Sequence, residues 1–160
     1  MYVPSEVFFV SGVGRHTARV ASFEHALRDA GIEPYNLVTV SSIFPPDTDK
    51  VEPHEGVEAL EAGQVVHAVL GRETATDGEP RAAVGVARPD GDGHGYFVEG
   101  DGVTGDEAET LAREMVETSE TTGDVARSFN VEASATADGD GYVTAVAVAV
   151  LVPPQPITDA

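Results

Sequence analysis

Residues 142–152, YVTAVAVAVLV, decide the fold class of this chain. From residue 146 to residue 152 valine alternates with alanine or leucine, so both faces of an extended strand are apolar. A strand that is apolar on both faces has to be covered on both sides. We therefore expect this strand to lie at the centre of a layered structure.

Six other segments are predicted to be strands, because they combine β-branched or aromatic residues with flanking Gly, Pro or Asp. They are Glu6–Ser11, Tyr35–Phe44, Gln64–Leu70, Arg81–Ala87, Gly95–Glu99 and Phe129–Thr136. The glycine- and aspartate-rich segments 90–94 and 138–141 are predicted to be turns between strands. Residues 47–63 are predicted to be a loop, with at most one helical turn in VEALEA.

Two helices are predicted from apolar residues at helical spacing. The first runs from Thr17 to Ala30, and Gly31 follows where a helix-ending glycine belongs. The second begins after Thr104, an expected N-cap residue with Glu107 three positions later. The apolar stripe of the first helix consists of Val20, Phe23, Leu27 and Ala30. That of the second consists of Ala108, Leu111, Ala112, Met115 and Val116.

These elements predict a single domain over residues 1–160. Seven strands and two main helices in this order indicate an α+β fold. The expected architecture is a sandwich of the αββα type, in which helices cover antiparallel or mixed sheets.

The composition narrows the possible functions. The chain has no cysteine, which excludes disulfides, thiolate metal sites and cysteine nucleophiles. Its 28 Asp and Glu against 9 Lys and Arg give a net charge of −19, which argues against nucleic-acid binding. Such a charge is typical of proteins from a salt-rich cytoplasm. Because no apolar run of about 18 residues and no basic leader is present, we expect no membrane segment and a cytoplasmic protein.

Three common site types find little support. The only lysine, Lys50, lies in the polar turn PPDTDK, which argues against a pyridoxal-phosphate enzyme. Gly12-Val-Gly14 is interpreted as an ordinary strand-to-helix turn rather than a phosphate cradle, because a third glycine is missing. No two of the five histidines stand four residues apart on a predicted helix, so no metal site is expected.

The segment NLVTVSSIFPP, residues 36–46, is the most unusual in the chain. Two serines end an apolar run, and two prolines follow after Ile43 and Phe44. Proline restricts its own φ and holds the preceding residue extended. The Ser41–Ser42 peptide is therefore a candidate for backbone strain. Taken alone, the pattern also fits a strand end with hydrogen-bonded serines.

This segment resembles the processing site of the pyruvoyl-dependent arginine decarboxylases of archaea and some bacteria. In that family an Asn-Leu strand runs into Ser-Ser-Ile, with Pro-Pro one residue later. FEHAL followed by AGI, within residues 23–32, is similar to the family's first helix and its exit. FVE, EAE and REM, within residues 97–115, are similar to the strand and helix that carry the family's catalytic glutamate. Together these segments span most of residues 7–152.

The resemblance implies a self-cleaving precursor. Ser42 attacks the carbonyl of Ser41, the chain divides into residues 1–41 and 42–160, and Ser42 becomes a pyruvoyl group. A decarboxylase without pyridoxal phosphate needs such a carbonyl to bind the substrate amine and withdraw electrons. The implied reaction converts L-arginine into agmatine and carbon dioxide, for polyamine synthesis. The implied assembly is a homotrimer with active sites between subunits.

The resemblance also implies roles for three further residues. Glu99 matches the family's proton-donating acid, and burial at the end of its strand is expected to raise its pKa. Asn36 matches an active-site asparagine that orients the scissile carbonyl or the bound substrate. Glu24 stands where the family has an aspartate for the substrate guanidinium, and this longer side chain puts the fit of arginine in question. No metal is implied.

Two alternatives remain open from the residues. The chain could be a pyruvoyl enzyme for another amino acid, such as histidine or aspartate. It could also be an acidic binding or scaffold protein in which the Ser41–Ser42 bond stays intact.

Overall fold

Strand β9 (Ala137–Val152) lies at the centre of one sheet in the computed structural model, which describes residues 2–119 and 123–155. It is buried from Val143 to Val152 and pairs antiparallel with β1 (Glu6–His16) and β5 (Val65–Gly78). The short strands β2 (Asn36–Thr39) and β4 (Asp49–Lys50) complete the sheet in the order β2-β5-β9-β1-β4. The predicted central strand is confirmed.

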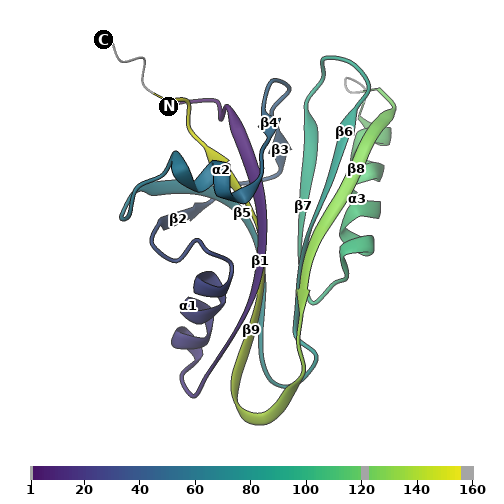
Figure 1. The fold of residues 1–160 in the computed structure, drawn as a ribbon. Coiled ribbons are helices and arrows are strands. Elements are labelled where there is room, and N and C mark those ends of the chain that lie inside the picture. Colours follow the sequence, from purple (N-terminus) through teal and green to yellow (C-terminus); the bar gives the residue numbers. More distant parts are fainter. Residues whose placement is uncertain (1, 120–122, 156–160) are drawn as a thin grey trace, which may run out of the picture.

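A second, antiparallel sheet faces the first (Figure 1). Its order is β3-β7-β6-β8, with the bounds Ile43–Phe44 for β3, Arg81–Pro89 for β6, Gly95–Asp101 for β7 and Val125–Ser134 for β8. Helices α1 (Arg19–Asp29) and α2 (Pro53–Glu58) pack on the first sheet, and α3 (Gly105–Thr118) packs on the second. The layers therefore run helix, sheet, sheet, helix, which confirms the predicted αββα sandwich.

The core lies in three apolar layers that follow from this order. Phe44, Phe97 and a run of Val and Ala fill the space between the two sheets. Phe8, Leu27 and Ile32 belong to the layer between the first sheet and its helices. Small residues such as Ala112 form the layer under α3. Close packing in all three layers is possible because alanine and valine dominate the facing strands.

The predicted loop at Gly12-Val-Gly14 is wrong, because β1 continues through it to His16. A Cβ at Gly12 would collide with the carbonyl oxygen of Ala26, and one at Gly14 would collide with backbone atoms of Ser22 and Ala26. The two glycines therefore allow α1 to lie directly on the strand. They serve helix packing, not a turn and not a phosphate cradle.

The predicted single strand Tyr35–Phe44 is also wrong. Its first half is β2, which pairs with β5 in the first sheet, and its last two residues are β3, which pairs with β7 in the second. Residues 40–42 cross between the sheets. Burial of Phe44 in the layer between the sheets, where its ring stacks on Phe97, gives the physical reason for this switch.

Smaller differences concern the turns and the acidic loop. Residues 138–141 are not a turn but belong to β9, where Asp138 pairs with Asp77 of an extended β5. Helix α2 begins at Pro53, one turn earlier than VEALEA, because proline suits the first helical position.

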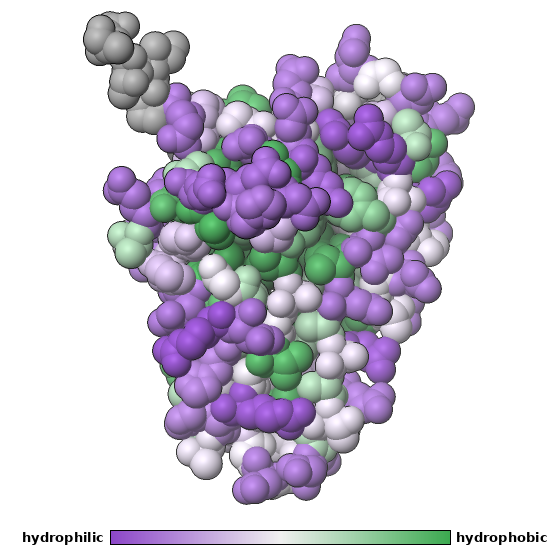
Figure 2. All heavy atoms as spheres, viewed as in Figure 1, coloured by the Kyte–Doolittle hydropathy of each residue, from purple (hydrophilic) through white to green (hydrophobic). Residues whose placement is uncertain are grey.

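The predicted N-cap of α3 and the predicted glycine after α1 are confirmed, whereas α1 begins at Arg19 and not at Thr17. Thr104 accepts a hydrogen bond of 3.2 Å from the backbone N–H of Glu107, and Gly31 has a φ of +82° after α1. The apolar stripes are only partly buried. Val20, Leu111 and Met115 are 76%, 48% and 39% exposed in the protomer. Figure 2 shows hydrophilic residues over most of one face, with hydrophobic residues gathered toward its middle.

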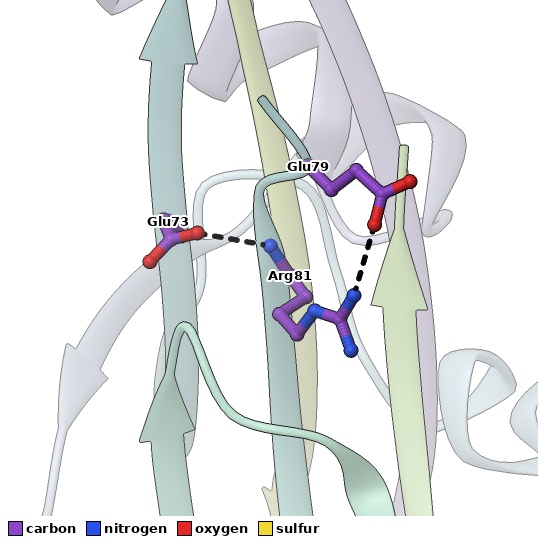
Figure 3. Close-up of polar contacts among 3 residues, drawn as sticks. All are labelled: Glu73, Glu79 and Arg81. Carbon is purple, nitrogen blue, oxygen red and sulfur yellow. Dashed lines mark hydrogen bonds and ion pairs between the residues drawn. The ribbon is translucent and has the colours of Figure 1, made fainter. Parts of the chain in front are cut away.

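The connection from β5 to β6 joins the two sheets and is held by one carboxylate (Figure 3). Glu73 on β5 accepts a hydrogen bond of 3.2 Å from the backbone N–H of Arg81, the first residue of β6. The guanidinium of Arg81 lies 3.3 Å from Glu79 in the same connection. These contacts fix the chain where it passes from the first sheet to the second.

Candidate active site

A cavity of about 470 Å³ opens between α1, β2 and the facing strands β5 and β7. Three of the predicted site residues line it, although they lie far apart in the sequence: Glu24, Asn36 and Glu99. The fold brings them together because α1 and β2 belong to the first sheet's side and β7 belongs to the second. The other residues of the wall are Phe23, Leu27, Glu33, Tyr35, Leu37, Thr39, Val40, Leu70, Arg72 and Asp101.

The cavity is strongly acidic. Glu24, Glu33, Glu99 and Asp101 line it, and Arg72 is the single basic residue of its wall. Carboxylates are the groups that bind a guanidinium or ammonium most strongly. The cavity is therefore suited to a cationic ligand with apolar carbon atoms, for which Phe23 and Leu37 provide contact surface.

Glu99 lies inside β7 and not at the end of a strand as predicted, because β7 continues to Asp101. The side chains of Phe97, Glu99 and Asp101 lie on the face of β7 that is directed at the first sheet, because residues two apart on a strand share a face. Loss of water contact raises the pKa of Glu99, a hydrogen bond from the backbone N–H of Leu70 lowers it, and the nearby Asp101 raises it. The net effect is a raised pKa, although Glu99 is exposed in the protomer. Burial therefore shifts Glu99 toward its protonated form.

Ser41 and Ser42 lie at a second, adjoining cavity of about 270 Å³. Glu99 lines both cavities, so the serine pair and the acidic pocket share one carboxylate. Phe97 and Met115 contribute apolar wall to the smaller cavity. The structure therefore brings all five predicted site residues to one region of the molecule.

The serine pair is anchored on both sides by different sheets. The backbone N–H of Val40 donates a 2.9 Å hydrogen bond to the carbonyl oxygen of Ala68 on β5. The backbone N–H of Phe97 on β7 donates one of 2.8 Å to the carbonyl oxygen of Ser42. The Ser41–Ser42 peptide therefore spans the gap between two rigid supports.

The expected strain takes no left-handed form. Among the described residues only glycines have a positive φ, so Ser41 and Ser42 both have a negative φ. The pair is half-exposed to exposed and lies in irregular backbone between β2 and β3. What distinguishes this peptide is its position between two anchors.

Asn36 is held in a fixed orientation at the cavity wall. Its side-chain Nδ2 donates a 2.8 Å hydrogen bond to the carbonyl oxygen of Gly63. Its backbone N–H donates one of 2.9 Å to the carbonyl oxygen of Gln64. Both acceptors belong to the segment just before β5. The bond from Nδ2 orients the side-chain amide, and the backbone bond holds Asn36 itself in place.

Sequence reasoning missed two residues of the pocket, Asp101 and Arg72. Asp101 stands two residues after Glu99 on the same strand face and accepts a 2.8 Å hydrogen bond from the backbone N–H of Arg72. The guanidinium of Arg72 lies 4.7 Å from the centre of the Phe23 ring. Asp101 could have been found from the two-residue period of a strand continued past Glu99. Arg72 was missed because β5 was expected to end at Leu70.

Residues 2–119 and 123–155 contain no group of three or more His, Asp or Glu side chains placed to hold a metal ion. None of the helices in these ranges is both long and apolar enough to cross a membrane.

Comparisons with known proteins show the family to which the chain is similar. A family model described as pyruvoyl-dependent arginine decarboxylase matches residues 6–156. The pyruvoyl-dependent arginine decarboxylase 2 of Archaeoglobus fulgidus is 48% identical over 158 residues, covering 94% of this chain and 98% of that protein. Pyruvoyl-dependent arginine decarboxylase 1 of the same organism is 44% identical over 158 residues, covering 94% and 99%. A protein of Chlorobium luteolum named "Probable pyruvoyl-dependent arginine decarboxylase" is 38% identical over 179 residues, covering 95% and 99%.

Proposed function

The chain belongs to the pyruvoyl-dependent arginine decarboxylase family, and on this premise we propose that it cleaves itself between Ser41 and Ser42 and then converts L-arginine into agmatine and carbon dioxide. The observation that carries the proposal is the shared position of Glu99. This one carboxylate lines both the cavity of the serine pair and the acidic pocket.

The cleavage uses atoms of the chain and one water molecule. The Ser42 hydroxyl oxygen attacks the carbonyl carbon of Ser41, and the C–N bond between them breaks, which leaves an ester. Loss of the Ser42 α-proton and of the Ser41 carboxylate gives dehydroalanine at position 42. Water then replaces nitrogen at the α-carbon, and ammonia leaves. The products are residues 1–41 and residues 42–160, with a pyruvoyl group at position 42.

The residues around Ser42 fit such a group. The hydrogen bond from Phe97 and the pairing of Ile43 with Tyr96 hold the chain that follows the cleaved bond. Val40 and β2 hold the chain that precedes it. Cleavage therefore leaves both new ends attached to the sheets, so the two chains stay in one folded unit.

The pyruvoyl group supplies the electrophilic carbonyl that binds the substrate amine and withdraws electrons as carbon dioxide leaves. The residues of the chain do the remaining work. Glu99, whose pKa is raised by burial, donates the proton that replaces the lost carboxylate. Asn36 orients the reacting end of the substrate with an amide that the Gly63 carbonyl holds in place.

The acidic wall of the larger cavity selects the substrate. Glu24 is assigned to the guanidinium, and Glu33 and Asp101 add negative charge around it. Arginine carries a cationic side chain, whereas aspartate would bring a second carboxylate into this wall. The charge of the cavity therefore favours arginine over an anionic amino acid.

A homotrimer is the proposed assembly. Met115, which lines the cavity of the serine pair, is exposed in the protomer, and Leu111 on the same helix is exposed as well. A neighbouring subunit placed over them would bury apolar surface and close the site to water. We further propose that the product feeds polyamine synthesis and that the enzyme works at high salt, as the net charge of −19 suggests.

The test is a mass measurement combined with an assay. Purified protein should consist of residues 1–41 and residues 42–160, the larger fragment should lack a free amino terminus, and arginine should release carbon dioxide. An intact chain that binds arginine without releasing carbon dioxide would contradict the proposal and support a binding protein. A cleaved chain that prefers histidine would support the proposed self-cleavage and refute arginine as the substrate.

A further inference from the structure

The turn that follows the serine pair is held by one arginine. The guanidinium of Arg88 lies 4.3 Å from the centre of the Phe44 ring. Its NH2 nitrogen donates a 3.1 Å hydrogen bond to the carbonyl oxygen of Pro46. One side chain thus contacts the residues two and four positions after Ser42.

Arg88 reaches this turn across a whole strand. It lies on β6, whereas Phe44 lies on β3, and β7 runs between them. The β7 residue that pairs with Phe44 is Gly95. A Cβ at Gly95 would lie 3.2 Å from the Cα and 3.3 Å from the Cγ of Arg88, and 2.5 Å from the carbonyl oxygen of Ala87. Glycine at this position therefore leaves the path over β7 open to the arginine side chain.

The partly dry setting of Arg88 strengthens its contact with the ring. Burial lowers the pKa of Arg88, and the neighbouring Arg127 lowers it further, while Asp49 raises it. A cation that has lost part of its hydration interacts more strongly with an aromatic face. The guanidinium also matches the flat ring better than an ammonium would.

The clamped ring is connected to the scissile peptide. Phe44 stacks on Phe97, with the ring centres 4.8 Å apart and an angle of 25° between the planes. The backbone N–H of Phe97 holds the carbonyl oxygen of Ser42. Arg88, Phe44 and Phe97 thus form a continuous path from β6 to the nucleophilic residue.

We propose that Arg88 is a positioning residue for self-cleavage, which clamps the Phe44–Pro46 turn so that the Ser42 hydroxyl stays within reach of the Ser41 carbonyl. The inference rests on the proposed cleavage at this bond. Arg88 is not among the residues that line the two cavities, so we expect it to make no contact with the substrate once cleavage is complete.

The experiment follows cleavage of newly synthesised full-length chain in high salt, by gel and mass spectrometry over time. Arg88→Met removes both the charge and the hydrogen bond, and Arg88→Lys keeps only the charge. A displacement of about 1 Å in a reacting pair can cost about 100-fold in rate, so we expect Arg88→Met to cleave about 10- to 100-fold more slowly. Arg88→Lys should fall between this variant and the natural chain.

Arg127→Met is the matched control. Arg127 faces Arg88 across the β6–β8 pair and is exposed, so its loss changes the same charge in the same sheet. It should cleave at the natural rate. The melting temperature of each variant is measured in the uncleavable Ser42→Ala chain, and kcat/KM for arginine is expressed per cleaved chain. Slow cleavage with an unchanged melting temperature and an unchanged kcat/KM supports a positioning role.

A double-mutant cycle tests the path through the ring. Phe44→Leu keeps an apolar side chain at a buried position but removes the aromatic face. If Arg88 acts through this ring, combining Phe44→Leu with Arg88→Met should slow cleavage little more than the slower single variant. Fully additive effects would overturn the inference.

The outcomes separate the inference from the function on which it rests. If the natural chain stays intact, or if Ser42→Ala still cleaves, the proposed function fails. If the natural chain cleaves, Ser42→Ala does not, and Arg88→Met cleaves at the natural rate, only the role of Arg88 is refuted. Equal slowing by Arg88→Met and Arg127→Met would also refute it.

Discussion

The backbone N–H of Phe97 donates a 2.8 Å hydrogen bond to the carbonyl oxygen of Ser42. This bond ties the residue that would carry the pyruvoyl group to β7, the strand that also carries Glu99 two residues later. The proposed nucleophile of the cleavage and the proposed acid of the decarboxylation are therefore held by a single strand. Their relative position survives cleavage, because the Ser42 carbonyl lies on the side of the peptide that is not broken.

Replacing the nucleophile tests the cleavage directly. Ser42→Ala removes the hydroxyl that attacks the Ser41 carbonyl, so the chain should stay at full length and release no carbon dioxide from arginine. Ser41→Ala is the control, because Ser41 contributes only its backbone carbonyl and this variant should still cleave. Intact mass after purification distinguishes the results. A Ser42→Ala chain that splits at this bond would refute the mechanism.

Replacing Glu99 tests the proton donor. Glu99→Gln keeps the size of the side chain but has no proton to transfer, so kcat for arginine should fall by about 10²- to 10⁴-fold. Cleavage at Ser41 should persist, which makes the assay valid per cleaved chain. The control is Asp101→Asn, which removes a neighbouring carboxylate of the same cavity and should cost much less. Near-natural turnover by cleaved Glu99→Gln would place the proton elsewhere.

The raised pKa of Glu99 predicts two effects of pH. The acid must be protonated to donate, so kcat should decline as pH rises through the pKa of Glu99, which burial raises from its ordinary value. The free energy of unfolding should also decrease as pH rises, because a raised pKa means that the folded protein binds this proton more tightly than the unfolded chain. The stabilisation by this proton is complete below the pKa of Glu99 in the unfolded chain. It is lost as pH rises through the pKa of Glu99 in the folded protein. Denaturant titrations of Ser42→Ala, with and without Glu99→Gln, should show this loss only when Glu99 is present.

The Glu24 prediction concerns substrate choice. Glu24→Gln should weaken arginine relative to its uncharged analogue citrulline, because the guanidinium loses an opposite charge. Glu24 is exposed in the protomer, so an effect of roughly 1 kcal/mol, about fivefold in the ratio of kcat/KM values, is expected. Glu33→Gln is the comparison, because Glu33 lines the same cavity but lies 3.6 Å from Arg28. An unchanged ratio in Glu24→Gln would show that the guanidinium binds another group.

Much of the fold could be predicted from local patterns. The central position of β9 follows from its two apolar faces, and the helix limits follow from Thr104 and Gly31. Such signals are visible in the sequence because a strand face or a helix cap depends on residues only a few positions apart. The site residues Ser41, Ser42, Asn36, Glu99 and Glu24 were identified through resemblance, and their roles stay predictions.

Other features depended on contacts between distant segments. The sequence of residues 35–44 resembles one continuous strand, yet β2 and β3 belong to different sheets. Gly12 and Gly14 resemble a turn, yet they are strand residues that make room for α1. In each example the local sequence is compatible with both the predicted and the observed conformation. The segment that packs against it decides which of the two forms.

The sequence by itself determined the layered α+β class, the helix ends and the unusual Ser-Ser pair before two prolines. The tertiary structure alone decided that this pair crosses between the sheets and that Asp101 and Arg72 join the pocket wall. It also placed Arg88 over Phe44, although β7 lies between their two strands in the sheet. The physical reason is that burial and sheet pairing join residues dozens of positions apart, and no local pattern of side chains specifies which ones meet.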